Sequence, residues 1–384
     1  MPLFMMRVLI VGGGIGGLAL AKFLEKKKID YLIIEKAKKF KSIGYVLGLW
    51  PNAGAMLKKL RVYKEIKEKS IVLPYFELQS ADGKALGRES LAKVCKGYGR
   101  VIETERDTIH RALRKLVKKS KMHMGVTVKK LIQLDDGIEV QFSNGKKETF
   151  DLVVGADGIN SQIREYVVPK KDVDYTGRTF WMFWCKKTKN LPKGVVYQAG
   201  EESLLSIFPT KSKKGYTIGL SMAAKPHYCE KDSDFSKTIK DRFSFMKGSA
   251  PKIINSLPKR PSEMYHHDDD EMHLSEWHKG RIVLMGDSCH ALSPLMGMGA
   301  AMALESAYVL AEELANNDSI PKSLAAYKKR RLPRIKKLVI ASKIIHLTVF
   351  QIPKSLEIVR DNYLGKIMLA QYMKLLRKFL GEKI

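Results

Sequence analysis

The sequence of 384 residues predicts an α/β fold, in which a parallel-sheet domain is interleaved with a β-rich region and followed by C-terminal helices. Three observations predict it. Glycine-rich turns follow buried apolar strands near residues 12 and 297, alternating strand patterns fill the middle of the chain, and helical patterns fill its end. The length favours two domains over one. A hydrophobic content of 45% describes a folded globular chain rather than a disordered one.

The first glycine-rich turn joins a strand to a helix. Apart from Arg7, residues 7–11 are apolar and rich in β-branched side chains, as in a buried strand. Three glycines follow in G-x-G-x-x-G spacing: Gly12, Gly14 and Gly17. A helical pattern comes next, and then a second strand, Tyr31–Ile34, that ends in Glu35. This order predicts a Rossmann-like dinucleotide site, because the glycines admit a pyrophosphate to the helix N-terminus and the acid accepts hydrogen bonds from a ribose.

A second glycine-rich loop repeats this order of elements later in the chain. A buried strand, Arg281–Met285, is followed by Asp287, and Gly297 and Gly299 precede a long helix. We expect this helix to offer a second N-terminus to an anion or a carbonyl oxygen. His290 is interpreted as a structural loop residue rather than an acid or base.

The middle of the chain predicts antiparallel strands with aromatic side chains on both faces. The strand at Thr179–Lys186 places Trp181 and Phe183 on one face, and Phe180, Met182 and Trp184 on the other. A sheet packed under helices and the wall of an apolar ligand pocket both explain this pattern. The pocket candidates are Trp181, Phe183, Phe208 and Pro294. Before this region, Asp157 ends a buried strand, where polar groups of α/β sheets face ligands.

Composition narrows the function classes. The net charge of +29 suits nucleic acid, an anionic membrane or an acidic substrate, but the lysines are spread along the chain and no nucleic-acid motif is present, so general surface basicity is favoured over membrane attraction. Four scattered cysteines and an N-terminus without a signal pattern predict reduced thiols and a cytoplasmic protein. No metal is expected, since the consecutive His and acidic side chains of residues 266–271 alternate in direction along a strand.

The C-terminal region is helical and basic. Pro333 and Pro353 are expected to divide it. Its last segment, Tyr363–Leu380, has an apolar face that includes Ile367 and Ala370 and a face of Lys and Arg side chains. Packing against the protein is favoured over a position on a membrane surface.

Three motifs now stand in order: GGGIGG with Glu35, GADGINSQIR and GDSCHALSPLMGMG. Together they resemble the single-component, FAD-dependent aromatic hydroxylases (class A flavoprotein monooxygenases), over about residues 7–330. The para-hydroxybenzoate hydroxylase, salicylate hydroxylase and tetracycline-inactivating monooxygenase groups belong to that family. We accordingly divide the chain into an FAD-binding domain of residues 1–70, 96–165 and 271–330, a β-rich substrate domain of residues 71–95 and 166–270, and a helical segment of residues 331–384.

The resemblance also implies the residues that would contact FAD. They are Gly12, Gly14, Ile15, Gly17, Glu35, Lys36, Gly48, Arg106, Asp157, Gly158, Asp287, Pro294, Gly297, Met298, Gly299 and Ala300. Arg106 looks like the family's FAD-contacting arginine. Two positions depart from the family's pattern, because Met298 replaces a frequent glutamine and Glu305 replaces an aspartate.

In this family the flavin carries the chemistry, so no catalytic side chain is expected. The resemblance implies that NAD(P)H reduces FAD, that O₂ forms a flavin C4a-hydroperoxide, and that a phenolic or polycyclic aromatic is hydroxylated. Two alternatives remain: a flavin reductase or dehydrogenase on the same scaffold, and a membrane-associated enzyme that acts on a quinone or polyprenyl lipid. The expected partner is a small aromatic molecule and not nucleic acid. The protein would be a monomer or dimer, cytoplasmic, with the inner face of the membrane as the alternative location.

Overall fold

The computed structural model describes residues 6–40, 45–169, 172–187, 191–226, 228, 235–350 and 352–384. Its first layer is a six-stranded sheet with the order β18-β19-β12-β1-β2-β8. The strands are β1 (Arg7–Val11), β2 (Asp30–Glu35), β8 (Met122–Met124), β12 (Leu152–Gly155), β18 (His278–Lys279) and β19 (Ile282–Leu284). All neighbours pair in parallel except β18 with β19, so the carboxyl ends of the central strands meet at one edge. The α/β prediction is confirmed.

Helices cover the six-stranded sheet and bury its apolar strands. The helix α1 (Ile15–Lys26) packs closely against α9 (Gly299–Asn316), which in turn contacts α2 (Pro51–Lys59) and α10 (Ile320–Ile345). Pro51 opens α2 at the first helical position, where its missing N–H has no intrahelical acceptor. Further helices are α3 (Tyr63–Glu68), α4 (Leu91–Val94) and α5 (Arg106–Arg114), and α8 (Asp287–His290) is a single turn.

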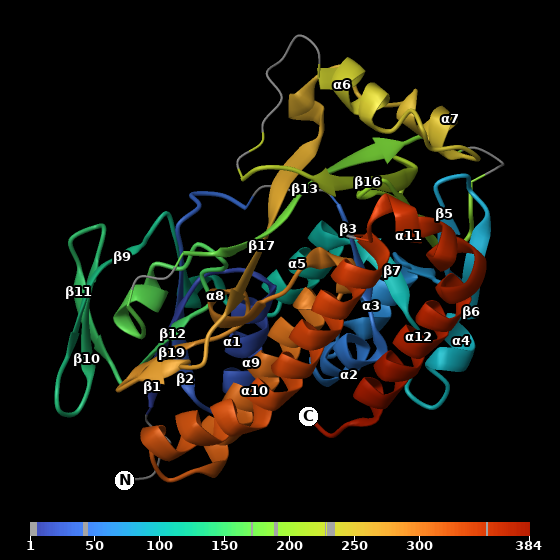
Figure 1. Ribbon diagram of the computed structural model, residues 1–384. Coiled ribbons are helices and arrows are strands. Elements are labelled where there is room, and N and C mark those ends of the chain that lie inside the picture. Colours follow the sequence, from blue (N-terminus) through green and yellow to red (C-terminus); the bar gives the residue numbers. More distant parts are fainter. Residues whose placement is uncertain are drawn as a thin grey trace.

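The second layer is a seven-stranded sheet with the order β17-β13-β16-β15-β14-β5-β6. Its strands are β5 (Tyr75–Ser80), β6 (Ala85–Ser90), β13 (Asp174–Cys185), β14 (Val195–Gly200), β15 (Ser203–Phe208), β16 (Tyr216–Ala223) and β17 (Tyr265–His273). The helices α6 (Phe235–Arg242) and α7 (Ala250–Ile254) lie on its outer side, at the top of Figure 1. The strands that alternation predicts in the middle of the chain are present, and the one expected at Thr179–Lys186 is part of β13, which ends at Cys185.

Two three-stranded sheets complete the β-structure. One is the meander of β9 (Val128–Gln133), β10 (Ile138–Phe142) and β11 (Lys147–Phe150), which projects from the side of the molecule (Figure 1). The other joins β3 (Val46–Leu49), β7 (Ile102–Glu105) and β4 (Ile71–Val72). Short 3₁₀ turns are η2 (Lys119–Lys121), η3 (Ile163–Tyr166), η4 (Pro261–Glu263) and η5 (Pro294–Met296).

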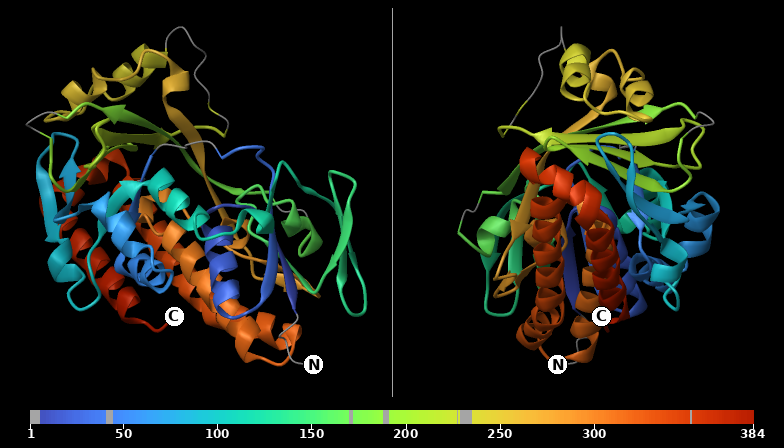
Figure 2. Two further views of the ribbon diagram at one scale, coloured as in Figure 1. Left: turned by 180° about the vertical axis from the view of Figure 1, so that it is seen from behind. Right: turned by 45° about the vertical axis from the view of Figure 1, so that its right-hand side comes forward.

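The C-terminal helices form a corner beside the two large sheets. After α10 come η6 (His346–Phe350), α11 (Lys354–Val359), η7 (Arg360–Leu364) and α12 (Gly365–Gly381). Figure 2 shows α10 and α12 running down side by side from α11. No helix within the described ranges is both long enough and apolar enough to cross a membrane.

Two expectations for the C-terminal region are wrong. Pro333 lies inside α10 and does not divide it, whereas Pro353 precedes α11 as expected. The helix continues through Pro333 because Arg331 and Arg334, on either side of it, are tied to the same buried carboxylate on α9. The apolar face of α12 is also narrower than predicted, since Leu369, Met373, Leu376 and Phe379 are buried but Ile367 and Ala370 are exposed.

Cys95, Cys185 and Cys289 are buried free thiols, and Cys229 lies outside the described residues.

Candidate active site

A cavity of about 770 Å³ lies between the six-stranded and the seven-stranded sheets. Its walls include the carboxyl ends of β1, β2 and β12, the N-termini of α1 and α9, and side chains of β13–β16. Ligands of open α/β sheets bind at this edge of the strands, and the volume is in the range of small-molecule and cofactor sites. The cavity therefore has a dinucleotide-type end and a second, largely apolar end.

The first glycine-rich turn has the geometry that close approach of a pyrophosphate requires. Gly12 has a φ of +114°, and a Cβ there would lie 2.3 Å from the Ala156 carbonyl oxygen. A Cβ on Gly17 would lie 2.0 Å from the Gly12 carbonyl oxygen, so this glycine lets α1 pack on β1. A Cβ on Gly14 would meet nothing within 4 Å, and Gly14 lines the cavity. The space that the spacing predicts for phosphates is present at the N-terminus of α1.

Glu35 and Lys36 line the cavity at the end of β2. The Glu35 carboxylate accepts hydrogen bonds from the backbone N–H of Gly13, at 2.9 Å, and of Ala37, at 2.8 Å. It thus holds the glycine-rich turn against β2 and leaves its remaining lone pairs for a ligand.

The second glycine-rich loop brings another helix N-terminus to the cavity. Pro294, Gly297, Gly299 and Ala300 line it, and Gly297 adopts a left-handed conformation with a φ of +60°. Gly299 leaves open space where a Cβ would lie. Met298 is fully buried and is not a lining residue, so its side chain packs in the core beneath the loop.

Two aspartates predicted to face a ligand, Asp157 and Asp287, lie at the cavity. Asp157 accepts hydrogen bonds from the Ser161 hydroxyl, at 2.6 Å, and from the Gln162 N–H, at 2.8 Å, so most of its capacity is used to shape the turn after β12. Asp287 is exposed to the cavity but deep within the protein. Desolvation raises the pKa of Asp287 above its ordinary value, and the charge of Arg106 partly offsets this.

Arg106 begins α5 and lines the cavity, as do Ile15, Gly48 and Gly158. A cation at a helix N-terminus opposes the helix dipole, so it is favourable only where an anion lies nearby. Here its backbone N–H donates to the Tyr45 carbonyl at 2.8 Å, which fixes the start of the helix at the cavity wall.

The predicted pocket residues divide between the two faces of the seven-stranded sheet. Phe208 and Pro294 line the cavity. Trp181 and Phe183 do not, because they are buried on the opposite face of β13, in the core beneath α6 and α7. Their neighbours Phe180 and Met182 line the cavity instead. Alternation along β13 predicts the two sets of side chains but cannot say which face is covered by helices.

Glu103 is a site residue that sequence analysis missed. It lies on β7 opposite Gly48, lines the cavity and is only 3% exposed. Among the described residues nothing donates a hydrogen bond to its carboxyl group, and burial raises its pKa from 4.5 to about 8. Two tyrosines, Tyr197 and Tyr372, line the same part of the cavity, and burial raises the pKa of each. This end of the cavity is therefore neutral at pH 7, with hydrogen-bonding groups on an apolar wall.

Replacing this acid with an amide, as in Glu103→Gln, is expected to change how stability depends on pH. The folded pKa lies above the ordinary value, so the stability that the bound proton contributes is complete below about pH 4.5 and is lost as pH rises to about 8. The advantage of the variant in unfolding free energy should grow by about 2 kcal/mol between pH 6 and pH 8. Urea unfolding of both proteins at the two values measures it, and a constant difference would contradict the assignment.

The stretch of His and acidic side chains at residues 266–271 has a structural role at the cavity. It forms most of β17, and two of its carboxylates hold the start of the second glycine-rich loop. The Ser293 hydroxyl donates to Asp269 at 2.8 Å, and the Ser293 N–H donates to Glu271 at 3.1 Å. The seven-stranded sheet thus positions the loop that closes the dinucleotide end of the cavity.

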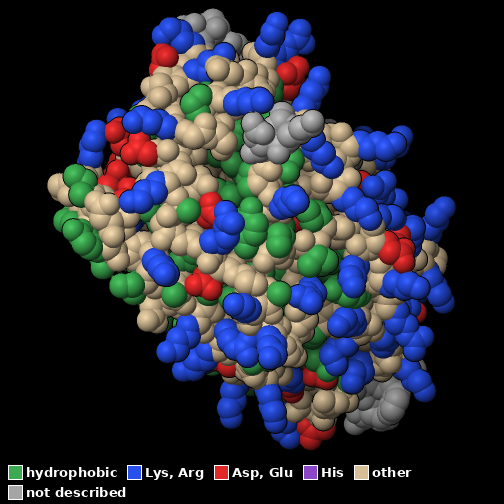
Figure 3. Space-filling model, turned by 90° about the vertical axis from the view of Figure 1, so that its right-hand side faces the viewer, with side chains coloured by type: hydrophobic (Ala, Val, Ile, Leu, Met, Phe, Trp, Pro, Cys, Tyr) green, Lys and Arg blue, Asp and Glu red, His purple; other side chains and the backbone are tan. Residues whose placement is uncertain are grey.

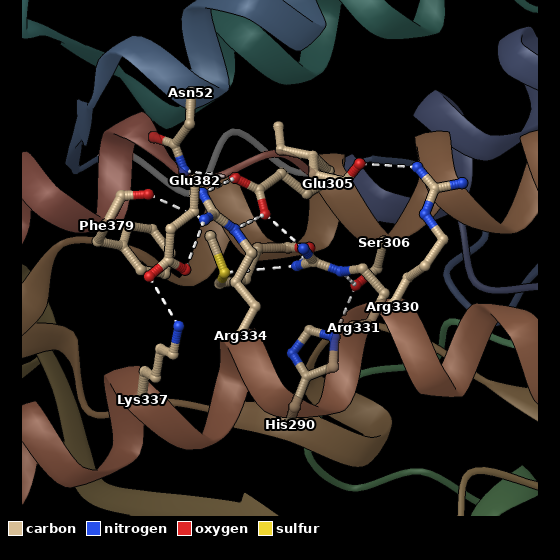
Figure 4. A network of polar contacts seen from close by, with 12 residues as sticks. Asn52, His290, Glu305, Ser306, Arg330, Arg331, Arg334, Lys337, Phe379 and Glu382 are labelled. Atoms are coloured by element: carbon tan, nitrogen blue, oxygen red, sulfur yellow. Dashed lines mark hydrogen bonds and ion pairs between the residues drawn. The ribbon is translucent and has the colours of Figure 1, made fainter.

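A buried ion cluster ties α9 to α10 (Figure 4). The Glu305 carboxylate pairs with Arg331 and with Arg334, and accepts a hydrogen bond from the Asn52 amide at 2.7 Å. Burial alone would raise the pKa of Glu305, but the two guanidinium groups outweigh it and hold the pKa below its ordinary value. The residue that departs from the family's aspartate is therefore fully paired.

His290 lies in the same region, and its contacts support the interpretation that it is a structural residue and not an acid or base. Its Nε2 accepts a hydrogen bond from the Gly286 N–H at 3.2 Å and lies 3.0 Å from the Ser306 hydroxyl. Burial lowers the pKa of His290 to about 3, so the ring is neutral.

Comparison with known proteins decides which family this site belongs to. Residues 5–342 match the model of the FAD binding domain family. The 2-heptyl-3-hydroxy-4(1H)-quinolone synthase of Pseudomonas aeruginosa is 30% identical over 312 residues, which are 80% of each chain. This chain belongs to the FAD-dependent monooxygenases. FAD is its cofactor, and the glycines, the two helix N-termini and the open space at Gly14 fit that group.

Two other similar proteins extend the comparison for this flavoprotein monooxygenase. The aurachin C monooxygenase/isomerase of Stigmatella aurantiaca is 27% identical over 338 residues, 87% of each chain. The structure of Klebsiella pneumoniae HpxO complexed with FAD and uric acid superimposes with a TM-score of 0.87 at 21% identity, and the match covers 97% of both chains. The second likeness shows that the fold is shared.

Proposed function

We propose that this monooxygenase hydroxylates a phenolic or polycyclic aromatic substrate with NAD(P)H and O₂. The observation that carries the proposal is the two-ended cavity, in which the FAD-type end continues into a space walled by Phe180, Met182 and Phe208. A flat apolar ring suits such walls, and the neutral Glu103 carboxyl offers a hydrogen bond to a ring substituent. The Tyr197 hydroxyl donates to the Leu295 carbonyl at 3.2 Å and can accept a hydrogen bond from the substrate. Two relatives are named for a hydroxyquinolone and for aurachin C, which supports a polycyclic substrate.

In this proposal the side chains bind, orient and exclude water, and bound FAD supplies the redox chemistry. The residues implied to hold FAD are those of the two glycine-rich loops, with Glu35 near the ribose and Arg106 near its anionic part. The apolar end keeps water from the reacting ring, and Asp269 and Glu271 hold the intervening loop in place. The chain would then divide into the FAD-binding and substrate domains expected from the sequence.

The first test is the visible spectrum of the purified protein, followed by addition of NADPH or NADH in air with a panel of phenols and quinolones. A flavin spectrum that bleaches faster with one ring class, together with a hydroxylated product, supports the proposal. A protein that stays colourless after incubation with FAD contradicts the assignment of the cofactor site.

The reductase alternative differs in its electron acceptor. A monooxygenase consumes one O₂ for each hydroxylated product and each NAD(P)H, whereas a reductase on this scaffold transfers electrons to an organic acceptor without O₂. Oxidation of NAD(P)H by a quinone under anaerobic conditions, with no hydroxylated product in air, would favour the alternative.

A further inference from the structure

The C-terminal helices carry most of the large hydrophobic side chains that the protein exposes. Of the thirteen exposed among the described residues, ten lie between residues 340 and 375, and we call these ten the C-terminal apolar face. Ile358 is 67% exposed and Tyr363 is 73% exposed. Isolated exposed hydrophobic residues are ordinary, but a group of this size on one corner of the fold marks an interaction surface.

Basic side chains surround the C-terminal apolar face. Five exposed lysines form no ion pair with a described residue: Lys336, Lys343, Lys366, Lys374 and Lys378. Figure 3 looks at the side of the molecule where α11 and α12 lie, and hydrophobic side chains gather in its middle among Lys and Arg side chains. The surface is therefore apolar in its centre and positive around it.

Three acidic side chains of this region already have a hydrogen-bond or ion-pair partner. Glu357 accepts a hydrogen bond from the Glu201 N–H at 2.7 Å, Asp361 pairs with Arg360 at 2.6 Å, and Glu382 pairs with Lys337 at 2.7 Å. Glu357 and the neighbouring, exposed Glu202 form no ion pair with a described residue, so they offset only part of the charge of the five lysines. Two copies meeting through this face would bring like charges together, which disfavours a symmetric dimer.

An anionic bilayer matches both properties of the surface, because its headgroups attract lysines and its interior accepts apolar side chains. We propose that the C-terminal apolar face docks this monooxygenase onto anionic phospholipid membranes. The helix α12 connects the docking face to the cavity, since Tyr372 lines the cavity and Ile367 on the same helix is exposed. Docking would place one wall of the cavity beside the bilayer, where apolar aromatic molecules concentrate.

The experiment is co-sedimentation of the FAD-loaded protein with vesicles of phosphatidylglycerol and phosphatidylcholine, and with vesicles of phosphatidylcholine alone. We expect binding to the anionic vesicles only. Ile358→Ser/Ile367→Ser should weaken it about tenfold or more, because two exposed apolar side chains are lost. The matched control is Val72→Ser/Leu134→Ser, which removes two exposed aliphatic side chains elsewhere and should bind like the wild type.

A second pair of variants separates this face from the general charge of +29. Lys343→Gln/Lys366→Gln should weaken binding more than Lys129→Gln/Lys130→Gln, which are exposed on β9. Equal losses in either matched comparison, or no binding to anionic vesicles, would overturn the proposal. So would a dimer in light scattering that Ile358→Ser/Ile367→Ser dissociates, since the face would then join two copies. Binding is measured without turnover, so the result is independent of the proposed hydroxylation.

Discussion

Gly14→Val is expected to fold normally and to lose FAD. A Cβ at this position meets no atom within 4 Å, and the backbone has a φ of −74° that any residue adopts. The valine side chain would occupy the space at the N-terminus of α1 that the phosphates need. Affinity for FAD should fall by at least about a hundredfold, since the close approach of the backbone to the pyrophosphate is lost. Titration of the apoprotein with FAD, followed by flavin fluorescence, measures the affinity.

A neighbouring glycine provides the contrast. In Gly17→Val the new side chain would meet the Gly12 carbonyl oxygen, which already lies 2.0 Å from a Cβ, so this variant should lose the packing of α1 on β1 and unfold at a lower temperature. Gly14→Val should retain the melting temperature of the wild-type apoprotein. Wild-type affinity for FAD in Gly14→Val would refute the location of the pyrophosphate, and Gly14→Ala, with a smaller side chain, tests the same point with less disturbance.

The second large effect is expected at the buried ion cluster. Glu305→Gln keeps the shape of the side chain but leaves the guanidinium charges of Arg331 and Arg334 uncompensated in a site where Glu305 and Arg331 are fully buried. Breaking such a cluster from one side should lower the free energy of unfolding by about 4 kcal/mol. Denaturant unfolding at pH 7 measures the change. Adding Arg331→Met should restore part of it, because one unpaired charge is removed.

An exposed pair serves as the control. Glu276 contacts Lys328 at 2.7 Å, but its side chain is 58% exposed, so Glu276→Gln should cost less than about 1 kcal/mol. The folded-state pKa of Glu305 is lowered, so its contribution is present above its ordinary value of 4.5 and is lost as pH falls through the folded pKa. The difference between Glu305→Gln and the wild type should therefore shrink in acid. Equal effects at Glu305 and Glu276 would contradict the cluster's role.

The FAD-type end of the site could be predicted because its requirements are local. A strand, three glycines at fixed spacing and a helix place Gly12, Gly14 and Gly17 with little help from the rest of the chain. The aromatic end could not be predicted in the same way. Which face of β13 lines the cavity depends on where α6 and α7 pack. Because this packing is long-range, the sequence led to Trp181 as a cavity residue, whereas Phe180 lines the cavity in the structure. Glu103 was missed because its isolation arises only when β3 and β7 pair.

Helix boundaries in the C-terminal region show the same contrast between what local sequence determines and what long-range contacts determine. Proline lowers helix stability locally, which predicts a break at Pro333. The break does not occur because contacts from another helix, through Glu305, hold the residues on both sides of it. At Pro353, which directly precedes α11, the local prediction is confirmed.

The bonds from β17 to Ser293 bear on how this enzyme can change over evolutionary time. Asp269 and Glu271 belong to the sheet that walls the aromatic end, yet they fix the loop at the other end. A new substrate preference that shifts β17 would therefore also disturb the loop that binds the flavin, whereas changes on β15, which does not pair with β17, would not act through Ser293. Divergence among related enzymes should accordingly be greater at positions such as Phe208 on β15 than at Asp269 and Glu271 on β17.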